Sequence, residues 1–558
     1  MLEAPLGKRG VSLQAWPVAV LLTLAIIGVY ISLVVWNDNT IVGTSNGLWK
    51  SVEVSAWSRK SDLNLDSGGI FYAAGYGRLS RLLPDSLVRY GVPAPDPTFR
   101  KMAILNAIFG GIASGLVFLL ALRFTNSAWL AVAIALAHAG AGFVLVNSIN
   151  SEDIIPAYAF FLAATFCFFE FVHLGGVAWF VSSAVMMALV TLFHWTVLGP
   201  ALAAFGAVFA CLLPKGRKYF GQGLAWLFLF LLCVQVLLLL AFPARHIPFW
   251  AAVYPEKAGG GGWVGLLGNK AWFALVGMGN YFSGGFNVSN YRIPFENNSL
   301  LRLMIYSWAV LLVSLAACVS TLLRRNVPAG LKLLAVAALA LFVVGELEAV
   351  YSQPQDPQMQ IEPMFVVMAG LILLAAVWRK PLAIGLLIVA AANGYWNLHL
   401  ISTRGRGGDS KAVAGIRELD RLFPKDRTMM VSQGFEVWVS WHFVLLRPDQ
   451  FGQYSDHNML LTKVFVDKRG ISANDAAAAV EKKIDDAFAA GRRVVADSVW
   501  TDLLQDSAAS FDTVTEEATA RAFLSELKTR YRMGSRWETL DGPFVELLPS
   551  GPATKRPL

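Results

Sequence analysis

Long apolar stretches alternate with short polar turns over the first 400 residues of the chain. A membrane-crossing helix needs about 20 mostly apolar residues, and about eleven stretches meet this requirement. The first runs from Trp16 to Trp36 and is expected to be a retained anchor, because its apolar core is longer than that of a cleavable signal peptide. The others are centred near residues 112, 136, 164, 186, 205, 232, 312, 340, 370 and 390. The pattern predicts a polytopic α-helical membrane protein.

The turns between these stretches predict an orientation. Short cytoplasmic loops of membrane proteins are enriched in Lys and Arg. With the N-terminus in the cytoplasm, nearly every cytoplasmic turn is basic; these turns contain Arg123, Lys215, Arg217, Lys218, Arg324, Arg325, Arg379 and Lys380. An odd number of spans then places the C-terminal part outside.

The chain is expected to have two domains. Residues 1–400 form the membrane domain, with a long first external loop at about 37–103 and another at about 243–300. Residues 401–558 are more charged and are expected to form a small external α/β domain, which would be periplasmic in a bacterium.

Within this second domain, alternating apolar residues predict three strands, at 428–431, 493–496 and 544–548. A helix is predicted from Ser472 to Ala490, with Ser472 as its N-cap and Gly491 as its stop.

Composition supports this picture and excludes other classes. Hydrophobic residues make up 56% of the chain and charged residues only 15%, which excludes a soluble enzyme and a disordered protein. The net charge of +8 is explained by the basic cytoplasmic turns, so no nucleic-acid partner is expected. All the cysteines lie in apolar stretches, and neither a disulfide framework nor a zinc site is predicted.

Acidic residues at the external membrane boundary are the candidate catalytic groups. Such carboxylates are partly desolvated and still accessible to polar substrates. Asp38 follows the first span, and Glu152 and Asp153 lie in the second external loop. The alternative interpretation is structural: Asp38 as a solvated residue at a helix end, and Glu152 and Asp153 as acids at a helix N-terminus.

The first external loop contains two amphipathic segments that are expected to lie along the membrane surface. One extends from Trp49 to Trp57, and the other begins at Asp66 and continues through Tyr76 to Pro84. They would form a floor on which a lipid-linked substrate is presented, or alternatively pack beneath the external domain.

This arrangement resembles the GT-C superfamily of polyprenyl-phosphate-dependent glycosyltransferases, which includes protein O-mannosyltransferases and lipid A aminoarabinose transferases. The similar features are the acid after the first span, surface helices in a long first loop, acids in the second external loop and an external C-terminal α/β domain. The resemblance implies an inverting transfer with Asp38 as general base, Asp62 and Asp66 being its rivals. A single carboxylate is a poor site for a hard cation, so no metal or other cofactor is favoured.

A glycosyl transfer of this kind also needs a cation for the departing phosphate and polar groups for the sugar. Arg292 is the preferred phosphate ligand. Arg100 and Lys101 are also basic groups near the boundary, and the favoured interpretation of these two is that they are interfacial anchors. The expected substrate-binding residues are Asp66, His194, Arg292, Gln355, Asp356 and Gln358. Glu346 and Glu348 lie at the same rim as Asp356.

The expected partners are a polyprenyl-phosphate-linked sugar donor, a lipid, glycan or protein acceptor, and membrane lipids, at the outer face of a bacterial inner membrane. Three other functions remain open: an O-antigen polymerase or ligase, a transporter or flippase, and a non-catalytic envelope assembly protein. A transporter would show repeated halves, broken helices or mid-span charges. No repeat is visible in the sequence, and His138 is the ionisable residue nearest a span centre.

Overall fold

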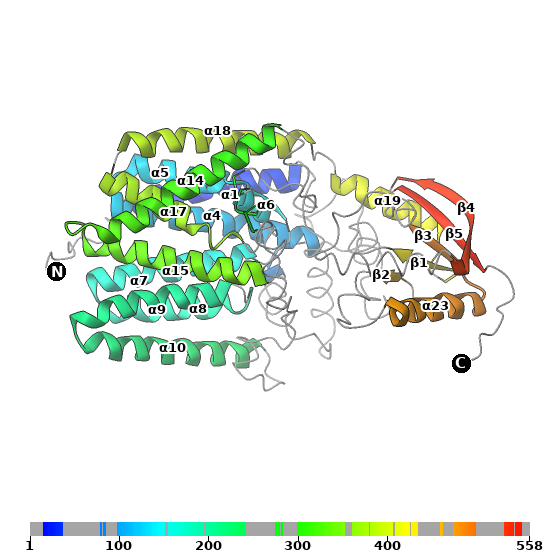
Figure 1. Cartoon of the computed structure of the whole chain (residues 1–558), viewed down its shortest axis with the longest axis horizontal. Helices are drawn as coiled ribbons and strands as arrows, with labels where there is room; N and C mark the ends of the chain where they lie inside the picture. The colour runs from blue at the N-terminus through cyan, green and yellow to red at the C-terminus, as the bar shows by residue number, and fades with distance from the viewer. Residues whose placement is uncertain are drawn as a thin grey trace. The chain divides into compact units, whose positions relative to one another are not determined.

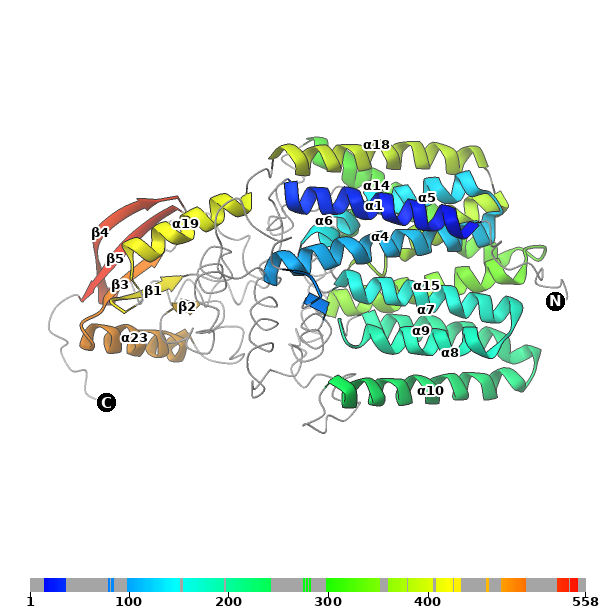
Figure 2. The same cartoon turned by 180° about the vertical axis from the view of Figure 1, so that it is seen from behind.

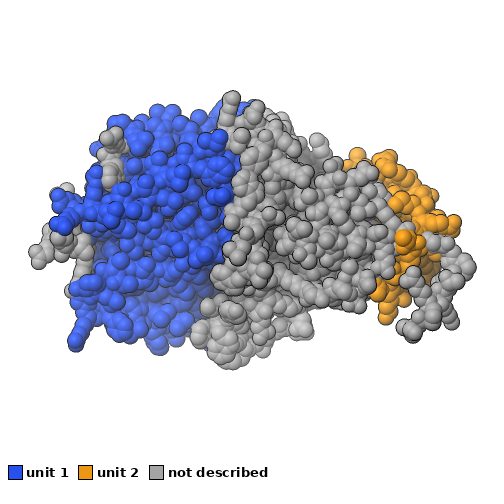
Figure 3. All heavy atoms as spheres, in the orientation of Figure 1, with its two compact units in different colours: residues 1–43, 57–88, 98–406 blue, residues 44–56, 89–97, 407–558 orange. Residues whose placement is uncertain are grey.

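A computed structural model of the chain describes two compact units, shown in Figure 3. The described residues up to 404 belong to unit 1, and those from 408 onward belong to unit 2. The described residues are 15–36, 79–80, 82–84, 98–150, 154–194, 197–241, 274–275, 277–279, 281–282, 298–351, 360–378, 380–404, 408–424, 426–432, 458–460, 473–497, 529–540 and 542–549.

Unit 1 is a bundle of helices that run along a common direction, some parallel and some antiparallel to their neighbours (Figures 1 and 2). Its helices are α1 (Ala15–Trp36), α4 (Thr98–Thr125), α5 (Ala128–Gly140), α6 (Gly142–Ile149), α7 (Ile154–Leu174), α8 (Val177–Val190), α9 (Leu198–Leu212), η3 (Leu213–Lys215), α10 (Lys218–Ala241), α14 (Asn298–Leu323), α15 (Ala329–Tyr351), α17 (Phe365–Leu373), η5 (Leu374–Trp378) and α18 (Lys380–Arg404). We call the end of this bundle at which α1, α6, α15 and α18 end and α4 and α7 begin the outer end, after the predicted topology.

The helices agree with the predicted membrane spans. Among the described residues, seven helices are long and apolar enough to cross a membrane, and the bent pair α5–α6 brings the number to eight if it is counted as one span. Three shorter apolar helices, at Val177–Val190, Leu198–Leu212 and Phe365–Val377, coincide with the predicted spans near 186, 205 and 370. The prediction of a polytopic helical fold is confirmed, and the chain is a multi-pass membrane protein.

The break between α5 and α6 was not predicted. The two helices meet at Ala141 with a bend of 64°, between Gly140 and Gly142. A broken helix leaves backbone carbonyl groups that need hydrogen-bond donors inside a bilayer. Asn397 of α18 supplies one, because its Nδ2 donates to the Gly140 carbonyl (2.9 Å) and also to the Phe282 carbonyl (2.8 Å).

A buried ion pair joins α4 to α7 near the opposite end of the bundle. Arg123 Nε lies 3.2 Å from Glu170 Oε1, and both side chains are buried. Removing one partner of a buried ion pair typically costs about 3–5 kcal/mol, because the remaining charge loses its closest compensating group. We therefore expect Glu170→Ala to lower the thermal unfolding temperature of the purified protein sharply.

The control for this prediction replaces both charges with apolar groups. Arg123→Met combined with Glu170→Leu leaves no unpaired charge and is expected to recover most of the lost stability. A double variant as unstable as Glu170→Ala would show that the pair itself, and not the stranded charge, stabilises the fold.

Unit 2 contains a five-stranded mixed sheet in the order β2-β1-β3-β5-β4. The strands are β1 (Thr428–Ser432), β2 (Asn458–Leu460), β3 (Arg493–Asp497), β4 (Tyr531–Thr539) and β5 (Gly542–Pro549). Strands β2, β1 and β3 are parallel, whereas β5 pairs antiparallel with both β3 and β4. Helices α19 (Gly408–Leu422) and α23 (Ala473–Ala489) lie on opposite faces of the sheet (Figures 1 and 2).

The core of unit 2 explains why the strand predictions succeeded. Met430, Val495 and Phe544, from three neighbouring strands, pack against Leu419 of α19 and Phe423. The predicted strands correspond to β1, β3 and β5, and the predicted helix corresponds to α23, with Gly491 at a φ of 70° just beyond it. Ser472 lies outside the described residues. The predictions missed α19, β2 and β4.

Candidate active site

Arg100 is buried near the start of α4, at the outer end of unit 1, where it is only 1% exposed. This corrects the interpretation of Arg100 as an interfacial anchor, which would keep its guanidinium in water. Lys101, the next residue, is partly exposed and agrees better with an anchor. Arginine keeps its positive charge when buried and presents donors that match phosphate and carboxylate oxygens.

The surroundings of Arg100 follow from helical periodicity. Residues three, four and seven positions further along a helix share its face. From Arg100 these are Ala103, Ile104 and Ala107, which belong to one buried core with Leu33 and Val34 of α1 and Ile149 of α6. Arg100 therefore lies on the face of α4 that packs toward the ends of α1 and α6.

Those two helix ends lead directly to the predicted acids. Asp38 comes two residues after Trp36, and Glu152 two residues after Asn150. The end of α6 is held to α4 by a hydrogen bond from Asn106 Nδ2 to the Asn150 carbonyl (2.8 Å). Asp38, Glu152 and Asp153 themselves lie outside the described residues, as do Asp62, Asp66 and Arg292, so their roles stay predictions.

A second polar group lies at the outer ends of α15 and α17. Glu346 and Glu348 are on the last turns of α15, and Gln360 and Glu362 precede α17. Gln360 Nε2 donates to Glu346 Oε2 (3.4 Å), and Glu362 lies within electrostatic range of both other glutamates. Glu346, Gln360 and Glu362 are buried. We call these four residues the carboxylate–amide group.

The predicted sugar-binding segment comes directly before this group in the sequence. Gln355, Asp356 and Gln358 come shortly before Gln360 and lie outside the described residues. The sequence had marked Glu346 and Glu348 as rim residues, and the structure brings them together with Gln360 and Glu362. Grouped carboxylate and amide side chains offer both acceptors and donors, which suits the recognition of sugar hydroxyls.

Two tyrosines connect the carboxylate–amide group to the centre of the bundle. Tyr158 of α7 is within electrostatic range of both Glu362 and Tyr281. Burial, followed by the influence of Tyr30, raises the pKa of the Tyr281 hydroxyl. The sequence offered no signal for these residues, because Tyr158 lies in an apolar stretch and Tyr281 in a long loop, and a tyrosine is common in both.

His138 lies beside the helix break, within the same network. Ser114 Oγ is 3.0 Å from His138 Nδ1, and the imidazole stacks on the Tyr158 ring with centroids 5.8 Å apart. Tyr30 donates a hydrogen bond to the Ala139 carbonyl (2.7 Å). Buried side chains of α1, α4, α5 and α7 thus surround the break.

His194 is the one predicted substrate-binding residue that the structure describes. It is buried in the turn after α8, and the preceding Phe193 packs on Phe160 of α7 and Phe109 of α4. Five residues later, a Cβ added to Gly199 would stand 3.3 Å from Glu348 Oε2. This places the segment containing His194 close to the carboxylate–amide group; its predicted role in binding substrate stays a prediction.

Within the part of the chain that the structure describes, no group of three or more His, Cys, Asp or Glu side chains is arranged to hold a metal ion.

Comparisons with known proteins gave a structural similarity only. No family model matches the sequence, and no curated protein matches it. The structure is similar to the crystal structure of ArnT from Cupriavidus metallidurans in the apo state, with a TM-score of 0.43 and 11% sequence identity. The match covers 96% of this chain and 98% of that chain.

Proposed function

We propose that the chain is an inverting glycosyltransferase of the bacterial inner membrane. It would transfer a sugar from a polyprenyl-phosphate donor to an acceptor hydroxyl at the outer face. The observation that carries the proposal is the burial of Arg100 on the face of α4 that packs toward α1 and α6, the helices that lead to Asp38 and Glu152. A buried cation near candidate bases is what a reaction with an anionic leaving group requires.

In the proposed reaction, the Asp38 carboxylate accepts the proton of the acceptor hydroxyl. The hydroxyl oxygen then forms a bond with the anomeric carbon from the face opposite the phosphate. The bond between that carbon and the phosphate oxygen breaks, and its electron pair leaves with the polyprenyl phosphate. Arg100 and Arg292 would stabilise the charge on the departing phosphate, since fixed cations in a water-poor site act strongly on developing charge.

The remaining predicted residues would bind substrate. Glu152 and Asp153 would hold the acceptor or replace Asp38 as base, and Asp62 and Asp66 stay its rivals in the first loop. The carboxylate–amide group, together with His194 and the residues Gln355, Asp356 and Gln358, would hydrogen-bond the hydroxyl groups of the sugar.

The proposal is tested by incubating the purified protein in lipid with a panel of polyprenyl-monophosphate sugars. The measurement is the release of polyprenyl phosphate, with polyprenyl-diphosphate sugars and nucleotide sugars as donors that the protein should reject. Release from a monophosphate donor, absent with heat-inactivated protein, establishes the donor class. Absence of release from every donor contradicts the proposal.

A transporter of lipid-linked sugars is the second candidate, and the broken span at Ala141 favours it. The two functions make opposite predictions in reconstituted vesicles. A transporter moves the labelled donor between leaflets without cleaving it, whereas the proposed transferase cleaves it.

A further inference from the structure

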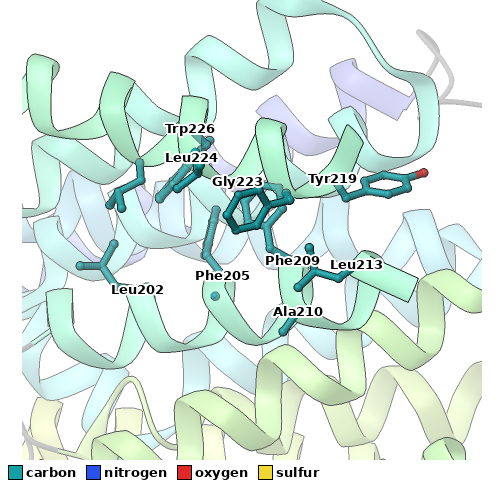
Figure 4. A pocket seen from close by; sticks show the side chains of 12 residues that line it. Leu202, Phe205, Phe209, Ala210, Leu213, Tyr219, Gly223, Leu224 and Trp226 are labelled. Atoms are coloured by element: carbon teal, nitrogen blue, oxygen red, sulfur yellow. The ribbon is translucent and has the colours of Figure 1, made fainter. Parts of the chain in front are cut away.

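A groove on the surface of unit 1 lies between α9 and α10, at the end opposite the outer end. Its volume is about 360 Å³, within the range of small-molecule sites, and its lining is almost wholly apolar. Figure 4 shows the groove, with the aromatic rings of Phe205, Phe209 and Trp226 at its base.

The base of the groove is rigid. The Phe205 and Trp226 rings are stacked with centroids 5.0 Å apart, and both residues are buried. Trp226 is also fixed to α8, because its indole Nε1 donates to Ser183 Oγ (2.8 Å). The hollow above this base is open at Gly206, where an added Cβ would meet nothing within 4 Å.

The length of the groove corresponds to one leaflet of a bilayer. Along α9 and η3 it extends from Leu202 to Leu213. At about 1.5 Å per residue this distance is roughly 16 Å, and half of the hydrocarbon core of a bilayer is about 15 Å thick. One extended acyl chain therefore matches the groove from the membrane surface to the midplane.

Positive charge is concentrated at the mouth of the groove. Tyr219 lines it, and Lys218 Nζ lies 5.0 Å from the centroid of the Tyr219 ring. Arg217 and Lys218 are exposed, and the sequence has a third basic residue, Lys215, two positions before Arg217. This cluster lies where the headgroup of a lipid would be when its acyl chain fills the groove, and basic residues at the membrane surface attract anionic lipids.

The geometry points to a binding site for an anionic glycerophospholipid, with one acyl chain in the groove and the headgroup phosphate at Arg217 and Lys218. An apolar face alone would accept any lipid. Specificity for an anionic lipid comes from the basic cluster at one end of a groove that is one leaflet long. The site is separate from the candidate active site and does not depend on the proposed function.

The inference is tested by native mass spectrometry of the full-length protein, with phosphatidylglycerol and phosphatidylcholine of the same chain length. The wild type is expected to retain one phosphatidylglycerol molecule about 10-fold more tightly than phosphatidylcholine. Gly206→Leu fills the groove and should reduce phosphatidylglycerol retention by a similar factor. Exchanging both Arg217 and Lys218 for Gln should remove the preference between the two lipids.

The matched control is Gly221→Leu on α10, where an added Cβ also meets nothing within 4 Å but the residue does not line the groove. This variant should retain phosphatidylglycerol like the wild type. Equal retention of the two lipids by the wild type, or full retention by Gly206→Leu, overturns the inference. A dimer that buries this groove against a second copy of the chain and excludes lipid would also overturn the inference.

Discussion

The Arg100→Gln variant is expected to release polyprenyl phosphate about 10²–10³-fold more slowly than the wild type, the usual effect of removing one fixed group that stabilises developing negative charge. Arg100 is buried at the outer end of α4 and faces the helix ends that lead to Asp38 and Glu152. A guanidinium in such a position acts on the phosphate as its charge develops, because little water is present to screen it.

The measurement is the initial rate of release, with size-exclusion chromatography and thermal unfolding to establish that each variant is folded. Lys101→Gln is the matched control, since it removes the same charge from the next residue, which is partly exposed. It should keep nearly full activity. Arg100→Lys keeps the charge but loses the forked geometry, and an intermediate rate is expected.

The outcomes separate a role in the reaction from a role in folding. If Arg100→Gln and Arg100→Lys are both folded and fully active, the guanidinium does not act on the phosphate and the proposed site is wrong. If Arg100→Gln unfolds, Arg100→Lys still decides the question, because a folded lysine variant with a reduced rate supports the proposal.

Asp38→Asn in the same assay tests the base. A general base contributes about 10²–10⁴-fold to a rate, so the variant should be almost inactive while still binding the donor. Unchanged release would move the base to Glu152, Asp153 or Asp66 and leave the donor class intact.

Gly394→Val is expected to destabilise the helix bundle strongly. Helices α5 and α18 cross where Gly140 meets Gly394, and a Cβ on Gly394 would stand 3.1 Å from the Gly140 Cα. Close backbone approach at small residues is a main source of helix association in membranes. A valine here meets backbone, which cannot rotate away. The cost should reach or exceed the upper end of the ~1–3 kcal/mol typical of overpacked interiors.

The Gly394→Val substitution should also disturb the break between α5 and α6, because Asn397 of α18 donates a hydrogen bond to the Gly140 carbonyl at that break. Separating the two helices would lengthen that hydrogen bond. The measurement is the yield of monodisperse protein and its unfolding temperature in detergent. Gly385→Val is the control on the same helix, since a Cβ there meets nothing within 4 Å. Equal unfolding temperatures for the two variants would contradict the importance of the contact.

The sequence by itself determined the features that depend on local pattern. A run of apolar residues long enough to cross a bilayer must form a helix, because every backbone polar group has to be satisfied within the segment. Accordingly, the predicted span centres coincide with the helices, and the alternating segments around Met430, Val495 and Phe544 became strands.

The tertiary structure decided which polar residues are buried and what they face. Arg100 has the sequence context of an interfacial anchor, but in the folded bundle it is buried, on a face of α4 that packs toward α1 and α6. The carboxylate–amide group combines the end of α15 with the turn before α17, and the contact between Gly140 and Gly394 joins residues far apart in the chain. Burial and close approach depend on neighbours contributed by other helices, which periodicity along a single segment does not encode.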